Sequence, residues 1–311
     1  MTSSGDSSAG GDSGLDRLLD RTLLLGYSAV GPAVRSRHWR SNDPARGSLA
    51  GRNALVTGGG GGLGEAIALG LARLGANVYI AVRSVERGAA AAERISSRLA
   101  GQKDAGEVFI EACDVSSFAS IDCFCARLGA RLEEQNRALD VVIHNAGVMP
   151  KERTVSVDRH ELSLATHVLG PVRMTEVLRP ALARSASGGR VVFVASGGMY
   201  AQSLEVDDIE YERDAYHGAT AYARSKRLQV EIVPQLEERW RSDGISVYSM
   251  HPGWVDTPGI AESLPRFRAL LRVALRSAES GADTAVWLAA TEPRPAGGGF
   301  WHDRKERPTS Y

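Results

Sequence analysis

Apolar residues along this chain fall into two alternating patterns. Short, nearly continuous apolar runs are separated by longer stretches in which apolar residues recur every three or four positions. The short runs predict parallel strands buried on both faces, and the longer stretches predict amphipathic helices. We therefore expect an α/β fold with a single doubly wound parallel sheet and helices on both faces. The expected strands are Asn53–Thr57, Asn77–Val82, Glu107–Ala112, Leu139–His144, Arg190–Ala195 and Ile245–Met250, and the expected helices span about 63–74, 85–100, 117–135, 158–183 and 219–241.

This alternation defines one expected domain, residues 49–303, and the sequence ahead of it differs. Residues 1–14 are almost all small or polar, which predicts a disordered tail. Residues 15–48 should form a helical extension and a linker, because leucines first recur every four or seven positions. The helix either packs on the domain or makes peripheral contact with a membrane through residues 15–40, which end in several arginines. Residues 304–311 are expected to be a C-terminal tail.

Composition narrows the class of protein. The 311 residues carry 37 lysines and arginines against 37 aspartates and glutamates, so the formal net charge is zero. This balance argues against a protein that binds nucleic acid through its phosphates. Hydrophobic residues make up 43% of the chain, which excludes global disorder, and three cysteines do not make a disulfide framework. We expect reduced thiols, no metal site and a cytoplasmic protein, membrane-associated only if residues 15–40 dock.

Five consecutive glycines follow the first expected strand and open the first expected helix. The run extends from Gly58 to Gly62, and Leu63 and Gly64 come next. Glycines at such a place let the backbone approach a phosphate, and the helix N-terminus supplies oriented N–H groups. Most glycine runs are flexible loops, but this position predicts a Rossmann-type domain that binds the pyrophosphate of a dinucleotide.

The spacing Thr57-Gly58-x-x-x-Gly62-x-Gly64 resembles that of the short-chain dehydrogenase/reductase family, and further motifs of that family follow in order. The resemblance covers roughly residues 50–303, and it is nearest to the dehydrogenase/reductase family member twelve-like group. It implies that residues at the ends of several strands bind the cofactor. Beside the glycine turn, these residues are Asp114, Val115, Asn145, Ala146, Gly147, Pro252, Gly253 and Thr257.

Ser196, Tyr222 and Lys226 resemble the family's catalytic residues. Tyr222 and Lys226 are four positions apart on an expected helix, so both side chains face the same way. A phenol has a pKa near 10, and a neighbouring ammonium should lower that pKa toward neutrality. Tyr222 would then exchange a proton with a carbonyl or alcohol oxygen that Ser196 orients, while a hydride moves to or from nicotinamide. The resemblance implies that Tyr222 and Lys226 also contact the cofactor.

His167 departs from the family pattern. The stretch Ala165–Pro171 resembles the family's A-x-N-x-L-G-P, so His167 stands where the fourth catalytic residue, an asparagine, is expected. That asparagine holds a water that links the lysine to solvent. A neutral imidazole could take over such a relay, whereas a protonated one would repel Lys226. The alternatives are an active enzyme, a slowed enzyme, and a dinucleotide-binding regulator or scaffold without turnover.

Cofactor preference follows from the end of the second strand. The sequence there is Val82-Arg83-Ser84, which lacks the acid that binds the ribose of NAD. Arg83 can pair with a 2′-phosphate, so we expect NADP(H), with NAD(H) less favoured.

The resemblance to the family also implies a class of substrate and an oligomeric state. The 26 positions from Ser196 to Tyr222 exceed the family's common spacing and resemble retinol-dehydrogenase-like members. This favours an apolar carbonyl or alcohol as the small-molecule substrate, and residues 258–276 should form a lid. The family usually dimerises through its two long helices, so we expect a homodimer or homotetramer.

Overall fold

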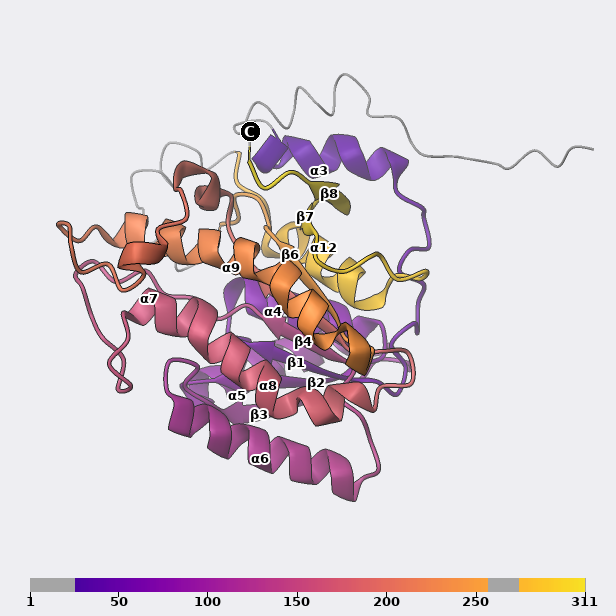
Figure 1. The fold of residues 1–311 in the computed structure, drawn as a ribbon. Helices are drawn as coiled ribbons and strands as arrows, with labels where there is room; N and C mark the ends of the chain where they lie inside the picture. Colours follow the sequence, from indigo (N-terminus) through magenta and orange to yellow (C-terminus); the bar gives the residue numbers. More distant parts are fainter. Residues whose placement is uncertain (1–25, 257–273, 311) are drawn as a thin grey trace, which may run out of the picture.

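The computed structural model describes residues 26–256 and 274–310. Across these ranges, eight strands form one sheet in the order β3-β2-β1-β4-β5-β6-β7-β8 (Figure 1). Neighbouring strands are parallel except for the last pair, β7 and β8. The strands are β1 (Asn53–Thr57), β2 (Asn77–Val82), β3 (Val108–Ala112), β4 (Val141–His144), β5 (Arg190–Val194), β6 (Ser246–Met250), β7 (Phe300–His302) and β8 (Lys305–Arg307).

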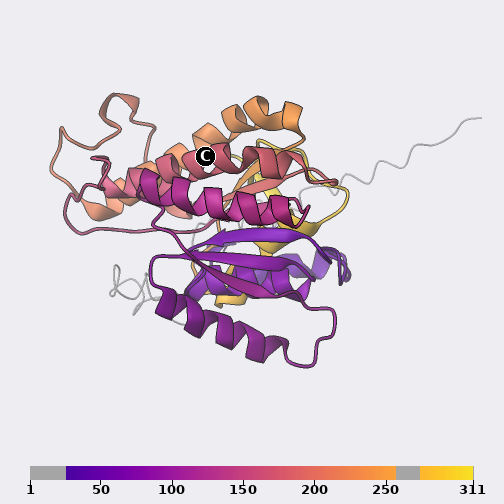
Figure 2. The same cartoon turned by 90° about the horizontal axis from the view of Figure 1, so that it is seen from below.

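Helices cover both faces of the sheet (Figure 2), which confirms the doubly wound α/β fold. Helices α4 (Gly62–Arg73), α5 (Val85–Leu99) and α12 (Ala278–Ala290) pack on one face. Helices α6 (Phe118–Glu134), α8 (Gly170–Ala183) and α9 (Gly218–Trp240) pack on the other. Shorter helical segments are α3 (Val30–Arg35), η1 (Ser36–His38), α7 (Leu162–Leu164), η2 (Ala165–Leu169), η3 (Gly197–Ala201), η4 (Val206–Asp208) and η5 (Arg241–Asp243).

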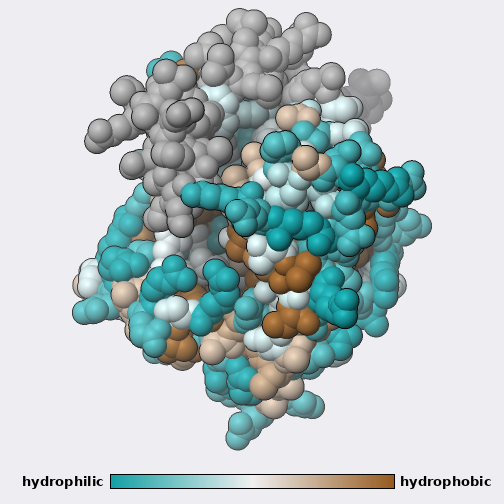
Figure 3. Space-filling view, turned by 90° about the vertical axis from the view of Figure 1, so that its left-hand side faces the viewer, coloured by the Kyte–Doolittle hydropathy of each residue, from teal (hydrophilic) through white to brown (hydrophobic). Residues whose placement is uncertain are grey.

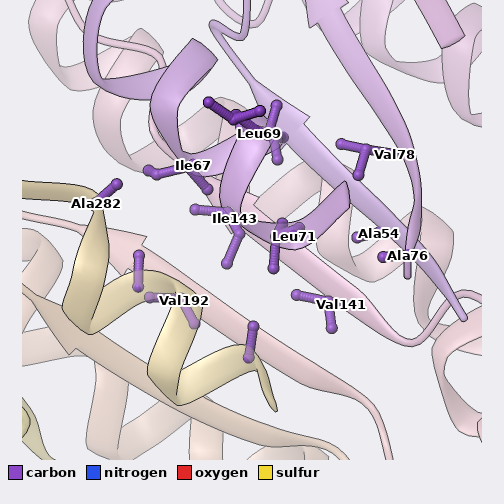
Figure 4. Close-up of a cluster of buried hydrophobic side chains, with 14 of the residues drawn as sticks. Ala54, Ile67, Leu69, Leu71, Ala76, Val78, Val141, Ile143, Val192 and Ala282 are labelled. Atoms are coloured by element: carbon purple, nitrogen blue, oxygen red, sulfur yellow. The ribbon is translucent and has the colours of Figure 1, made fainter. Parts of the chain in front are cut away.

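The core explains why the strands are apolar throughout. Val141 and Ile143 of β4 point toward Ile67 and Leu71 of α4, and Ala282 of α12 lies in the same cluster (Figure 4). The opposite face of the sheet carries a second buried cluster under α6, α8 and α9. Because both faces are buried, the polar residues of the sheet concentrate at the strand ends.

The prediction that residues 304–311 form only a tail was wrong for residues 305–307. Residues 305–307 form β8, which pairs antiparallel with β7 and extends the sheet beyond residue 303. Asp303 and Arg304 connect the two strands with φ of 49° and 58°. Positive φ at both positions is typical of a two-residue hairpin turn, but neither residue is the glycine or asparagine that usually marks such a turn in a sequence.

The long helix expected over 158–183 also differs. It begins at Leu162, and the stretch η2 is π-helical before α8 continues it. A π-helical turn inside a helix often marks a functional site, and this one contains His167. The expected tail 1–14, the start of the extension up to residue 25, Thr257, and most of the expected lid lie outside the described residues.

The carboxyl ends of β1 to β6 all reach the same edge of the sheet, as parallel strands require. The loops after β4 and β5 project to the left in Figure 1, and Figure 3 looks onto that side. Its surface is largely hydrophilic, with hydrophobic residues gathered in a small area. Within the ranges described, no helix has both the length and the hydropathy needed to cross a bilayer.

Candidate active site

The glycine turn between β1 and α4 is closely packed against its neighbours. Gly58 has φ +70°, and a Cβ at this residue would lie 2.9 Å from the Cα of Ala146. A Cβ at Gly64 would overlap the carbonyl oxygen of Gly58, whereas one at Gly61 would meet open space. Leu63 packs on the core. The turn therefore places the N-terminus of α4 at an accessible edge, where its N–H groups can bind an anion.

Thr57 joins the glycine turn to the turn after β4. Its buried Oγ1 accepts hydrogen bonds from the backbone N–H groups of Asn145 (3.0 Å) and Ala146 (3.1 Å). The Asn145 Nδ2 donates in return to the Thr57 carbonyl oxygen, at 3.0 Å, and Gly147 follows. Thr57 was absent from the expected site residues, although it begins the glycine motif. These hydrogen bonds hold the glycine turn and the turn after β4 together.

The ends of β2 and β3 complete this side of the site. Arg83 directly follows β2 and is exposed, and Ser84 caps helix α5 by accepting from the Arg87 N–H. At the end of β3, the Asp114 carboxylate accepts hydrogen bonds from the N–H and the hydroxyl of Ser116. Val115 is buried. Residues expected to bind one dinucleotide therefore follow four neighbouring strands.

The three expected catalytic residues lie together at the end of β5 and on α9. Lys226 is buried, and its Nζ donates to the Val194 carbonyl oxygen at 2.7 Å and lies 5.6 Å from the centre of the Tyr222 ring. The Ser196 Oγ accepts from the Gly198 N–H at 3.2 Å. The Ser196 hydroxyl also lies close enough to Tyr222 to affect the pKa of its phenol. The four-residue spacing thus places both α9 side chains beside Ser196.

The electrostatics of this group differ from the expected pattern. Burial raises the pKa of Tyr222 and outweighs the opposite effect of the neighbouring Ser196 hydroxyl. Burial also lowers the pKa of Lys226 to about 7. The ammonium of Lys226 is hydrogen-bonded to Val194 rather than to the phenol, so the expected lowering of the Tyr222 pKa was wrong for this arrangement. A protonated phenol at neutral pH is suited to donate a proton.

His167 is fully buried and both of its ring nitrogens are engaged. Its Nε2 accepts from the Val148 N–H at 3.0 Å, which leaves Nδ1 protonated to donate to the Ser225 Oγ at 2.7 Å. Ser225 donates in turn to the Tyr222 carbonyl oxygen at 2.8 Å. Burial, reinforced by Lys226, holds the pKa of His167 well below its ordinary value. The imidazole is therefore neutral, and it ties the loop after β4 to α9.

Two further expected residues follow β6. Gly253 has φ +77° and packs against the side chain of Arg276, and Pro252 is partly buried beside it. The next residue, Trp254, donates its N–H to the carbonyl oxygen of Tyr27 at 2.8 Å. This contact brings the N-terminal extension to the site; packing on the domain was one of the two expectations for the extension, but its place beside the site was not predicted.

Comparison with known proteins agrees with this arrangement. The family model for short chain dehydrogenases matches residues 52–266. The chain belongs to the short-chain dehydrogenase/reductase family. It is 38% identical over 266 residues to dehydrogenase/reductase SDR family member 12 of Bos taurus, covering 84% of this chain and 79% of the relative. The match confirms the resemblance to this family and supports the conclusion that the chain is an oxidoreductase.

Two further proteins are informative. Human retinol dehydrogenase 14 is 30% identical over 295 residues, or 89% of this chain and 84% of the relative. RhlG of Pseudomonas aeruginosa, solved in an active-site complex with NADP, is 27% identical with a TM-score of 0.64, covering 82% of this chain and 95% of RhlG. The glycine turn of this chain fits such a cofactor, because a side chain at Gly58 or Gly64 would collide with neighbouring backbone and disrupt the turn, whereas Gly61 faces open space.

Proposed function

We propose that this short-chain dehydrogenase/reductase is NADP(H)-dependent and transfers a hydride between nicotinamide and the carbonyl or alcohol carbon of an apolar small molecule, with Tyr222 as general acid/base. The observation that carries the proposal is the grouping of Ser196, Tyr222 and Lys226 at the sheet edge that also carries the glycine turn. The name of human retinol dehydrogenase 14 supports an apolar substrate.

The residues present fit a bound nicotinamide dinucleotide. Gly58, Gly62, Leu63 and Gly64 would hold its pyrophosphate at the N-terminus of α4. The exposed Arg83 would pair with the 2′-phosphate, which favours NADP(H) over NAD(H). When bound, the nicotinamide supplies or accepts the hydride. The other residues proposed to hold the cofactor are Asp114, Val115, Asn145, Ala146, Gly147, Tyr222, Lys226, Pro252, Gly253 and Thr257.

The side chains of the chain itself handle the proton. Ser196 and Tyr222 would hydrogen-bond the substrate oxygen and orient the carbonyl carbon. Tyr222 carries its proton at neutral pH, as an ordinary phenol does, and can donate it as negative charge develops on that oxygen. Lys226, with a pKa of about 7, would stabilise the resulting phenolate when protonated.

The assembly and location belong to the same proposal. We place a homodimer or homotetramer contact on the long helices α8 and α9, by analogy with the family. Buried Cys113 and Cys125 and exposed Cys123 are all free thiols, which agrees with the reducing cytoplasm. Peripheral membrane contact through residues 15–40 remains part of the proposal, and no role in binding nucleic acid is proposed.

Steady-state oxidation of NADPH across a panel of aldehydes and ketones tests the function. Tyr222→Phe should lower kcat by about 10²- to 10⁴-fold, because it removes the proton donor. Tyr248→Phe is the matched control, since this hydroxyl lies on β6 and donates to the Pro295 carbonyl oxygen. Cofactor binding without turnover on any carbonyl, unchanged by His167→Asn, would instead indicate the regulator or scaffold.

A further inference from the structure

A buried ionic cluster fixes the described start of the N-terminal extension to the domain. The Asp303 carboxylate accepts hydrogen bonds from Arg35 Nη1 (2.7 Å) and from Arg276 Nη1 (2.6 Å). Arg276 also donates from Nη2 to the Gly26 carbonyl oxygen (2.7 Å) and from Nε to that of Tyr27 (3.0 Å). The side chains of Arg276 and Asp303 are 1% and 3% exposed. Residues 26–35 are therefore an integral part of the fold, and α3 lies beside β7 and β8 (Figure 1).

Tyr27 is the residue that this cluster holds next to the active site. Its side chain is only 3% exposed. The ring makes edge contacts with His251, at 4.4 Å between centroids, and with Trp254, at 6.2 Å. It stacks against Tyr200 at 6.5 Å. Tyr27 therefore packs on both loops that flank the substrate side, the one after β5 and the one after β6.

The Tyr27 ring also packs against Gly197, the residue after Ser196. A Cβ at Gly197 would lie 2.8 Å from Cε2 of Tyr27, so the ring is directly against this backbone. Gly197 begins the turn η3, whose Gly198 N–H donates to the Ser196 Oγ. The Ser196 hydroxyl is therefore hydrogen-bonded to a turn whose first residue, Gly197, packs against the Tyr27 ring.

We propose that Tyr27 is a positioning residue, which acts through the turn Gly197–Ala201 to hold Ser196 in its catalytic orientation. The inference rests on the proposed function, in which Ser196 orients the substrate oxygen. Misplacement of such a group by about 1 Å can cost on the order of 10²-fold in rate. The N-terminal extension would then contribute to turnover itself, independently of any contact with a membrane.

Substitutions at Tyr27 in the full chain test this inference. We expect Tyr27→Ala to lower kcat at least about ten-fold, because the turn loses its support. The Kd for NADPH should stay within about three-fold, since the ring contacts that the described residues show involve Gly197, Tyr200, His251, Trp254 and His302 rather than the glycine turn. Tyr27→Phe keeps the ring and should restore kcat to within about three-fold. Val30→Ala, at an exposed position of α3, is the matched control.

Two further readouts separate positioning from a general loss of structure. Amide hydrogen exchange should quicken at residues 197–202 in Tyr27→Ala and stay unchanged in α5. Gly197→Ala should lower kcat because its Cβ meets Tyr27, and it should lower kcat less in the Tyr27→Ala background. Unchanged kcat and unchanged exchange in Tyr27→Ala, or fully additive effects of the two substitutions, would overturn the inference.

The failure of the proposed function has a different signature. In that case the unmodified protein turns over no carbonyl of the panel while it still binds NADPH. Exchange at residues 197–202 then decides the inference alone. Faster exchange in Tyr27→Ala supports the packing of Tyr27 on the turn, and unchanged exchange overturns it.

Discussion

His167 shows how a single residue can depart from a family pattern and keep the site intact. The sequence left open whether its imidazole is neutral or charged. Burial answers this, because it lowers the pKa of the ring well below the ordinary value. With both nitrogens bonded to Val148 and Ser225, the side chain holds two elements together. No sequence pattern reveals these partners, since they lie 19 and 58 positions away.

His167→Asn should therefore keep kcat within about three-fold of the unmodified protein, because an amide can also accept one hydrogen bond and donate another. His167→Ala removes the acceptor of the Val148 N–H and the donor to the Ser225 Oγ and leaves a buried cavity, so it should lower the free energy of unfolding by at least about 2 kcal/mol. Urea titration and steady-state kinetics measure both effects. A large loss of turnover in His167→Asn would show that the imidazole has a catalytic role of its own.

At the scale of a residue, the proposed preference for NADP(H) depends on Arg83. Arg83→Ala should lower kcat/KM for NADPH by about 10- to 100-fold, because a charge-assisted hydrogen bond contributes about 1.5–3 kcal/mol. The value for NADH should change little. Arg98→Ala, which removes an exposed partner of Glu279 at the far end of α5, is the matched control. Equal losses with both cofactors would contradict a contact with the 2′-phosphate.

At the scale of elements, the positions of the strands and of the glycine turn follow closely from local sequence. The apolar runs predicted β1 to β6, and the glycine motif predicted a turn between β1 and α4, where the structure has it. The π-helical stretch η2 and the hairpin β7–β8 could not be predicted in this way. Both depend on packing against distant parts of the chain, and in Asp303-Arg304 the arginine stands where a tight turn usually has glycine.

The glycine turn gives a prediction for an element. Gly64→Ala should abolish cofactor binding or lower the melting temperature by several degrees, because its Cβ would overlap the Gly58 carbonyl oxygen. Gly61→Ala is the control: its backbone is extended, and a Cβ there meets nothing within 4 Å. Differential scanning fluorimetry with and without NADPH measures both variants. Equal behaviour of the two would show that the turn is less tightly packed than described.

At the scale of the whole molecule, contacts between residues far apart in the sequence hold the N-terminal extension on the domain, and no local pattern predicts them. Asp303 joins Arg35 and Arg276, which are 268 and 27 positions away, and so ties the extension to the last hairpin. Hydrophobic periodicity suggested a helix at the start of the chain, but not where it docks. The partners are charged residues that would ordinarily be assigned to the surface.

Asp303→Asn removes the buried carboxylate that pairs with both Arg35 and Arg276. We expect a loss of about 3–5 kcal/mol in the free energy of unfolding, as for other buried pairs that lose one partner. Asp122→Asn removes an exposed partner of Arg173 and should have little effect. Urea denaturation measures both. Similar stability of the two variants would contradict a structural role for the buried cluster.

The central claim is that this chain catalyses hydride transfer, and isotope transfer tests it most directly. The protein is incubated with a carbonyl panel and NADPH deuterated at both C4 positions, and the products are analysed by mass spectrometry. We predict that the alcohol product gains one deuterium on its carbinol carbon, and that Tyr222→Phe lowers the yield by about 10²-fold or more. Bound NADPH with no labelled alcohol from any carbonyl would contradict the account.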